Sequence, residues 1–214
     1  MRDPRPRRRL MTPEEYLAFE RRSSRKHEYV DGVVYAMSGT TRRHYKLLFN
    51  VARHLHTAAA GGACEVFAQD LKVHVAPTKY YYPDVVVVCG PEDDEADVIA
   101  DPCVVVEVTS RSTRATDHRE KLIAYRTVPT LRAYLIVSHR ERLVDRHWRD
   151  AGGAWQHEVV TPDSGGRVAV PCPAGGVLTL DGIYEGVTLP ARLRRLKEPA
   201  PRAYAAGPAA AAGI

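Results

Sequence analysis

The spacing of hydrophobic residues along the chain predicts three helices. Thr12 begins a capping box and predicts a short amphipathic helix that ends near Arg22. A longer helix is expected over residues 41–59, because apolar side chains recur there every three or four residues. A second capping box at Asp117 predicts a helix that stops before Pro129.

Strands are expected between and after these helices. The segments are a hairpin at 27–37, then 64–68, 71–75, 83–89, 103–108, 133–137, a second hairpin of 142–148 with 155–160, and short strands within 167–189. The valine runs in 83–89 and 103–108 do not alternate with polar residues, which predicts strands buried on both faces. A strand, a helix and a strand in succession form a crossover, so 103–108 and 133–137 should lie parallel. The fold class is therefore α/β, with a mixed central sheet flanked by helices and extra antiparallel hairpins.

Composition is that of one folded domain and excludes a membrane-spanning protein. The chain has 214 residues, of which 44% are hydrophobic and 27% charged. No apolar run approaches the roughly 20 residues that a transmembrane helix needs. The basic start leads into no hydrophobic stretch, so it does not resemble a secretory signal, and a cytoplasmic location is expected.

The net charge of +5 belongs to the ends of the chain. Residues 1–9 and 187–214 each carry +4, whereas residues 10–186 carry −3. We expect a basic disordered tail over 1–10, one domain over 11–190 and a second basic, Ala- and Pro-rich tail over 191–214. Met11 is an alternative start. Basic tails raise nonspecific affinity for phosphate backbones, but they do not indicate what the folded part does.

The four cysteines, Cys64, Cys89, Cys103 and Cys172, are widely spaced and include no C-x-x-C pair. This spacing argues against a disulfide framework and against a zinc ribbon. The sequence therefore predicts buried thiols.

Two acidic residues attached to the valine strands are the strongest candidates for chemistry. Asp84 directly precedes four valines, and Glu107 lies within the run VVVEV. An ionised carboxylate in such a place costs several kcal/mol unless a cation or hydrogen bonds compensate it. If the two strands are neighbours, the carboxylates can meet at one end of the sheet and bind Mg²⁺ with a backbone carbonyl. The alternatives are a turn role for Asp84 and an ion pair of Glu107 with Arg111 or Arg114.

The residues around this pair resemble a known family. Pro83-Asp84, followed after 23 residues by Glu107, resembles the PD-(D/E)-x-K signature of restriction-endonuclease-like nucleases. The matching stretches are MTPEEYL at 11–17, EYVDG at 28–32, His44, VVEVTSRST at 105–113, Asp117, Lys121, Tyr125 and RAYLIV at 132–137. Together they resemble the Uma-two restriction endonuclease family over residues 11–190.

The resemblance implies a restriction-endonuclease-like core and a divalent-metal phosphodiesterase centre. Asp84 and Glu107 would be metal ligands, joined by the carbonyl of Val108. Thr109 stands where the nuclease signature has its lysine. Lys121, in the following helix, is the candidate for orienting the attacking water, although a lysine on an amphipathic helix is usually solvated.

Three further residues have a weaker case. Glu28 and Asp70 are candidate additional carboxylates. His44 lies on the apolar stripe of the long helix, so we interpret it as a core histidine, with a role at the site as the alternative.

The predicted function is a Mg²⁺- or Mn²⁺-dependent endonuclease that acts on DNA in preference to RNA, as a homodimer. The rival prediction is a catalytically degenerate module on the same fold that binds nucleic acid or protein. It follows from the missing strand lysine.

Overall fold

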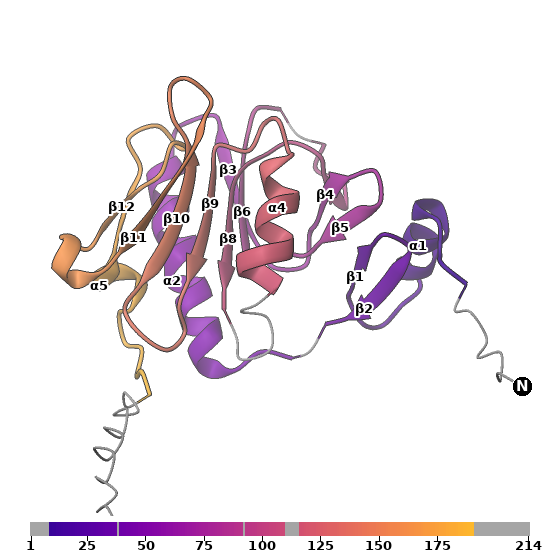
Figure 1. Ribbon diagram of the computed structural model, residues 1–214, viewed down its shortest axis with the longest axis horizontal. Coiled ribbons are helices and arrows are strands. Elements are labelled where there is room, and N and C mark those ends of the chain that lie inside the picture. The colour runs from indigo at the N-terminus through magenta and orange to yellow at the C-terminus, as the bar shows by residue number, and fades with distance from the viewer. Residues whose placement is uncertain (1–8, 38, 92, 110–115, 191–214) are drawn as a thin grey trace, which may run out of the picture.

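A six-stranded mixed sheet forms the centre of the protein in the computed structural model, which describes residues 9–37, 39–91, 93–109 and 116–190 (Figure 1). In spatial order its strands are β11 (Trp155–Val160), β10 (Val144–Arg149), β9 (Ala133–Val137), β8 (Pro102–Val108), β6 (Val85–Cys89) and β3 (Cys64–Ala68). Strands β8 and β9 run parallel, and the other neighbouring pairs run antiparallel. The predicted crossover is confirmed. The hairpin β10–β11 extends the sheet at its β9 edge.

Both faces of the valine strands are buried, as predicted. In β6, Val85 and Val87 contribute to one hydrophobic core, whereas Val86 and Val88 contribute to the other. This division follows from the two-residue repeat of a strand. Helix α2 (Arg42–Ala59) covers the first face, and the short helix α4 (Leu122–Arg126) covers the second.

A second, smaller sheet lies beside the α4 face. Its order is β2 (Val33–Ala36), β1 (His27–Val30), β5 (Lys79–Tyr81), β4 (Lys72–Ala76) and β7 (Val98–Ile99). The β1–β2 turn has positive φ at Asp31 and Gly32, as the hairpin signal predicts. Helix α1 (Pro13–Glu20) begins with the predicted capping box and packs Tyr16 against Tyr29. Strands β5 and β7 are too short for a hydrophobic repeat, so the sequence did not predict them.

The chain closes against the α2 face with η2 (Pro162–Ser164), β12 (Arg167–Ala169), β13 (Val177–Thr179) and α5 (Leu180–Ile183). The tails expected over 1–10 and 191–214 fall almost entirely outside the described residues. None of the helices in the described ranges has the length and apolar character that crossing a membrane requires.

The predicted capping box at Asp117 is wrong. Asp117 is the first residue of a π-helical turn, η1 (Asp117–Lys121), and the residue before it, Thr116, is already helical and makes no side-chain cap bond. Single π-helical turns are often found at functional sites. Here the wider turn directly precedes α4 and ends at Lys121.

The prediction of free buried thiols is also wrong. Disulfides join Cys64 to Cys89 and Cys103 to Cys172, and the described residues contain no free cysteine. Cys64 lies directly opposite Cys89 in the β3–β6 pair. Sequence spacing does not reveal this contact, because strand register sets it.

His147 on β10 is a buried ionisable residue away from the strand ends. Its side chain stacks on His157, and Arg126 lies 3.3 Å from its Nδ1 atom. Burial, with the nearby charges of His157 and Arg126, lowers the pKa of His147 to about 4. Asp145 opposes this shift and His118 adds to it. His147 is therefore neutral in the folded protein at pH 7.

We expect acid to destabilise the fold through His147. An unfolded histidine binds a proton below about pH 6.5, whereas folded His147 does so only near pH 4, so the unfolded state gains protons between these values. The free energy of unfolding should fall by roughly 2 kcal/mol across this window, after allowance for solvent screening. Urea unfolding at pH 7 and pH 4.5 measures it. His147→Phe should flatten the dependence, and His56→Gln, an exposed control, should not; equal slopes in all three proteins would contradict the assignment.

Candidate active site

Asp84 and Glu107 meet at one end of the central sheet. Asp84 directly precedes β6, and Glu107 is the penultimate residue of β8. Because Val85 pairs with Val106, the next positions outward are Asp84 and Glu107. The Oδ2 atom of Asp84 accepts a hydrogen bond of 2.7 Å from the backbone N–H of Val108. The expected convergence is therefore present. The side chain of Asp84 bonds to the neighbouring strand β8, which goes beyond the alternative role in its own turn.

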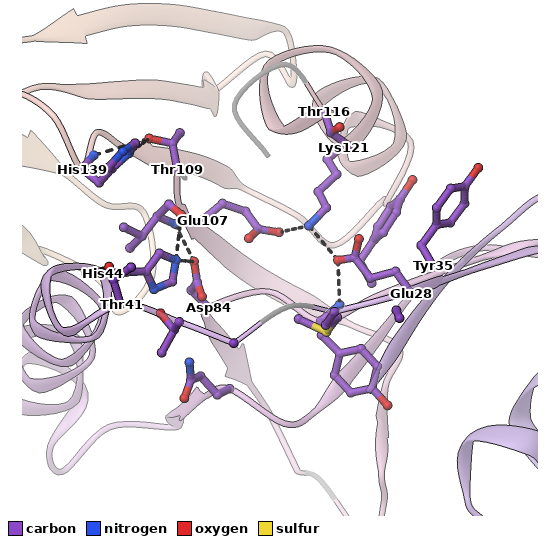
Figure 2. A pocket seen from close by; sticks show the side chains of 18 of the residues that line it. Glu28, Tyr35, Thr41, His44, Asp84, Glu107, Thr109, Thr116, Lys121 and His139 are labelled. Atoms are coloured by element: carbon purple, nitrogen blue, oxygen red, sulfur yellow. Dashed lines mark hydrogen bonds and ion pairs between the residues drawn. The ribbon is translucent and has the colours of Figure 1, made fainter. Parts of the chain in front are cut away.

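His44 lies beside this pair, in the first turn of α2 (Figure 2). Its Nε2 atom is 2.9 Å from the carbonyl oxygen of Val108 and 3.2 Å from Oδ2 of Asp84. Both of these atoms are acceptors, so Nε2 carries the proton. His44 makes the hydrogen bond expected of a core histidine, and it also lies beside Asp84, as the alternative role at the site requires. It lies on the apolar stripe, but the first turn of α2 reaches the end of the sheet, where the stripe borders a cavity.

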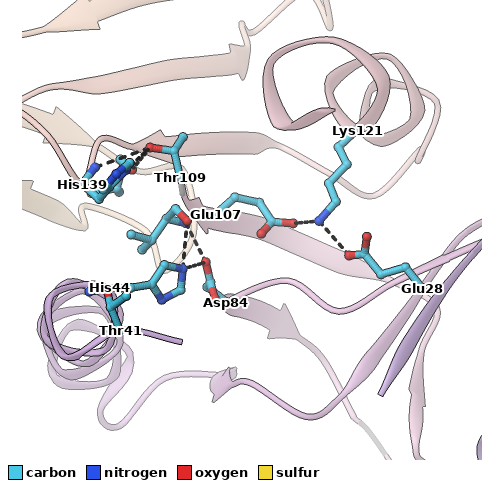
Figure 3. Close-up of polar contacts among 10 residues, drawn as sticks. Glu28, Thr41, His44, Asp84, Glu107, Thr109, Lys121 and His139 are labelled. Carbon is cyan, nitrogen blue, oxygen red and sulfur yellow. Dashed lines mark hydrogen bonds and ion pairs between the residues drawn. The ribbon is translucent and has the colours of Figure 1, made fainter. Parts of the chain in front are cut away.

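Lys121 is buried between two carboxylates (Figure 3). Its Nζ atom lies 2.9 Å from Oε1 of Glu107 and 2.7 Å from Oε1 of Glu28, and only 4% of the residue is exposed. The ring of Tyr81 lies under the ammonium group, 5.4 Å from centroid to Nζ. A solvated surface role for Lys121 is therefore wrong. The long side chain brings the charge from η1 to the strand end.

Glu28 enters the site from the second sheet, where it is part of β1. Besides Lys121, it accepts a bond of 3.4 Å from the backbone N–H of Tyr82. From the sequence, Glu28 is one of the weaker candidates, and its contact with Lys121 is not predicted. Its only sequence signal is its place in the EYVDG stretch.

These residues line one cavity of about 770 Å³ (Figure 2). Within the described part of its lining, four carboxylates face two cations, Arg43 and Lys121. The carboxylates belong to Glu28, Asp84, Glu107 and Glu120. This excess of negative charge in a half-enclosed space favours binding of a cation.

Thr109, which replaces the strand lysine, brings no charge. Its Oγ1 atom lies 3.2 Å from Nδ1 of His139 and 3.4 Å from the carbonyl oxygen of Val137. Burial, together with the charges of Arg140 and Arg43, lowers the pKa of His139. Thr109 has no charge and His139 is neutral near pH 7, so Lys121 is the cation beside Glu107 at this end of the sheet.

Asp70 is not brought into this cavity. It lies in the turn between β3 and β4 with a positive φ of 64°, and it lines an adjacent cavity of about 590 Å³ that also contacts Asp84. Arg111 and Arg114, the alternative partners of Glu107, lie outside the described residues.

The donor set at the strand end fits Mg²⁺ or Mn²⁺. Carboxylate and carbonyl oxygens are hard ligands, and Mg²⁺ commonly uses one or two carboxylates and retains several waters. Among the described residues, no three side-chain ligand atoms of Asp, Glu or His residues all lie within 4.8 Å of one another. The oxygens of Asp84, Glu107 and Val108 would therefore form an open site completed by water.

Comparisons with known proteins identify the family of this chain. Residues 13–181 match the Uma2 family, whose description is "Putative restriction endonuclease". The chain is 39% identical over 147 residues to the uncharacterized protein slr1290 of Synechocystis sp., covering 68% of this chain and 77% of that protein. It is 30% identical over 150 residues to sll1609 of the same organism, covering 65% of this chain and 85% of that protein.

A solved structure shares the fold. The crystal structure of a "putative nuclease belonging to DUF820" from Anabaena variabilis superposes with a TM-score of 0.68 at 15% identity, covering 83% of this chain and 99% of the other. Residues 13–181, which match the family, include the elements β6, β8 and η1 that carry the site. The chain therefore belongs to the Uma2 family and has the restriction-endonuclease-like fold.

Proposed function

We propose that this protein is a Mg²⁺- or Mn²⁺-dependent endonuclease that hydrolyses phosphodiester bonds of DNA. The observation that carries the proposal is the convergence of Asp84, Glu107 and Lys121 in one cavity at the strand end. Two carboxylates can hold a divalent cation for phosphodiester hydrolysis, and an ammonium can stabilise the negative charge that develops in the reaction. Here they come from three separate elements, so the convergence is a property of the fold.

Each side chain has a distinct role in the proposed reaction. Asp84, Glu107 and the carbonyl of Val108 would hold the divalent cation, which supplies positive charge to a phosphate oxygen and lowers the pKa of a water molecule. Lys121 would orient the attacking water and stabilise charge on the phosphorane. Glu28 and Glu107 hold the ammonium in place, so it need not reorganise during the reaction.

His44 is a positioning residue in this proposal. Its Nε2–H group donates to the carbonyl of Val108 and lies next to Oδ2 of Asp84. Partners of metal ligands fix the orientation of those ligands and commonly affect metal affinity by about 10- to 100-fold.

A surface next to the cavity supports a nucleic acid as the substrate. Helix α2 presents the exposed rings of Tyr45 and Phe49, whose centroids lie 6.4 Å apart, and exposed Arg42 and Lys46. Cations contact phosphates, and aromatic rings stack on bases. We propose DNA in preference to RNA because the family description names a restriction endonuclease. A homodimer would bring two such centres to the two strands of a duplex.

The carboxylates should be required for cleavage. Asp84→Asn and Glu107→Gln each remove one ligand charge, so each should slow cleavage of supercoiled plasmid by on the order of 100-fold in Mg²⁺ or Mn²⁺. Asp181→Asn and Glu158→Gln change exposed side chains in the same way and should cut like wild type. Retained cleavage in both site variants would exclude the proposed centre. If wild-type protein binds DNA but cuts with neither metal, the binding module is the better description.

Lys121 should be needed for both stability and turnover. Lys121→Gln leaves two carboxylates unpaired by an ammonium, so the free energy of unfolding should fall by about 3 kcal/mol. Cleavage should slow strongly while Mn²⁺ binding, measured by calorimetry, is retained.

The matched control for Lys121 is the double variant Glu28→Gln/Lys121→Gln. It removes one of the two carboxylates, so it should recover part of the lost stability without recovering cleavage. A Lys121→Gln protein that cuts as fast as wild type would disprove the catalytic role.

His44 should tune metal affinity without being essential. His44→Ala should raise the metal concentration for half-maximal cleavage by about 10- to 100-fold. His44→Gln, whose amide can still donate a hydrogen bond, should raise it less, and His56→Gln on the same helix should not change it. An unchanged metal dependence in His44→Ala would show that His44 does not position Asp84.

A further inference from the structure

The four cysteines of the chain gather at the end of the central sheet opposite the candidate active site. Cys64 begins β3, Cys89 ends β6, and Cys103 lies near the start of β8. Cys172 comes from the turn between β12 and β13, which the bond from the N–H of Gly176 to the carbonyl of Pro173 closes. Asp84 and Cys89 bracket β6, which separates the two places by roughly 17 Å.

The sulfur atoms are closer together than two separate disulfides require. Cys64 pairs with Cys89, and Cys103 pairs with Cys172. The sulfurs of Cys89, Cys103 and Cys172 also all lie within 4.8 Å of one another, so the two disulfides are in contact. Four thiolates around a tetrahedral Zn²⁺, with Zn–S bonds of about 2.3 Å, place their sulfurs roughly 3.8 Å apart. The arrangement is within reach of that geometry.

The chemistry of the cluster favours a soft metal. All four donors are sulfur, and thiolates select Zn²⁺ over Mg²⁺. Cys103 and Cys172 are only 9% and 8% exposed, which limits access of water, whereas Cys89 is exposed at the rim and gives a route for entry. A site with four protein ligands and no open position is structural.

A shared ion would also link elements that the disulfides leave separate. The Cys64–Cys89 disulfide joins two strands that already pair, and the Cys103–Cys172 disulfide joins β8 to the β12–β13 segment. A single ion bound by all four sulfurs would join β3, β6, β8 and that segment at one point.

We propose that Cys64, Cys89, Cys103 and Cys172 bind one Zn²⁺ in the reduced protein, and that the two disulfides are the oxidised, metal-free form. Reduction of the two disulfides takes four electrons and four protons, which two molecules of a dithiol supply as they become disulfides. Binding of Zn²⁺ then displaces four protons from the four thiols. This site is independent of the proposed nuclease centre, because it lies at the other end of the strands and uses other ligands.

The test is a metal titration of the full chain after reduction by a phosphine without oxygen, with Co²⁺ as the spectroscopic probe. Each disulfide is opened as the phosphine takes oxygen from water to become its oxide. We expect one equivalent of Co²⁺ to produce the absorption of tetrahedral cobalt thiolate, and Zn²⁺ to remove it by displacement. Zn²⁺ should also raise the thermal midpoint of the reduced protein, and Mg²⁺ should do neither.

Variants distinguish this site from the acidic centre. The double variant Cys103→Ser/Cys172→Ser should lose the cobalt thiolate absorption and the stabilisation by Zn²⁺. Cys64→Ser, a change at a partly exposed position that disturbs the core less, should also weaken both. Glu107→Gln, the control, should keep the absorption unchanged.

Three results would overturn the proposal. The first is a reduced protein with four titratable thiols that takes up no Co²⁺ as thiolate. The second is an absorption that persists in the double serine variant. The third is resistance of both disulfides to the phosphine in the folded protein, because the metal could then not enter.

Discussion

The buried contact of Lys121 with Glu28 and Glu107 links the parts of the protein that form the site. Glu28 belongs to the second sheet, Glu107 to the central sheet, and Lys121 to the π-helical turn between β8 and α4. Removing three charges from water costs several kcal/mol each, and close opposite charges compensate this cost only in good geometry. Contacts of 2.7 and 2.9 Å meet that condition. The same ammonium that we propose acts on the substrate therefore also joins the second sheet to the central sheet, in addition to their shared hydrophobic core.

Antiparallel pairing of β6 with β8 determines where chemistry can occur. The pairing brings the start of β6 to the end of β8, so Asp84 meets Glu107 and Val108 at one end of the sheet. It also brings the end of β6 to the start of β8, so Cys89 meets Cys103 at the other end. Between the two ends, the strands are valine-rich and buried on both faces. A rigid, apolar sheet thus separates a site of hard oxygen donors from a cluster of soft sulfur donors.

Much of the fold and part of the site could be predicted, where the signal was local or lay in a long regular pattern. The Thr12 capping box, the Asp31-Gly32 turn and the two valine strands are confirmed. Asp84 and Glu107 could be found because a charge beside a run of valines needs a compensating partner. The predictions failed where a contact depends on strand register or side-chain reach. The contact of His44 with Asp84 cannot be read from a helical pattern, and the cysteines look unrelated along the chain, whereas Lys121 could be found through the family resemblance.

By itself, the sequence determined the mixed α/β class, the crossover between β8 and β9, and the identity of the two strand-end carboxylates. These features depend on hydrophobic periodicity and turn preferences, which act over a few neighbouring residues. Only the tertiary structure decided that Glu28 holds Lys121, that His44 supports Asp84, that Asp70 lies outside the main cavity and that the cysteines pair. Those outcomes depend on packing between segments far apart in the chain. Such packing is set by the burial of whole strands and not by any local pattern.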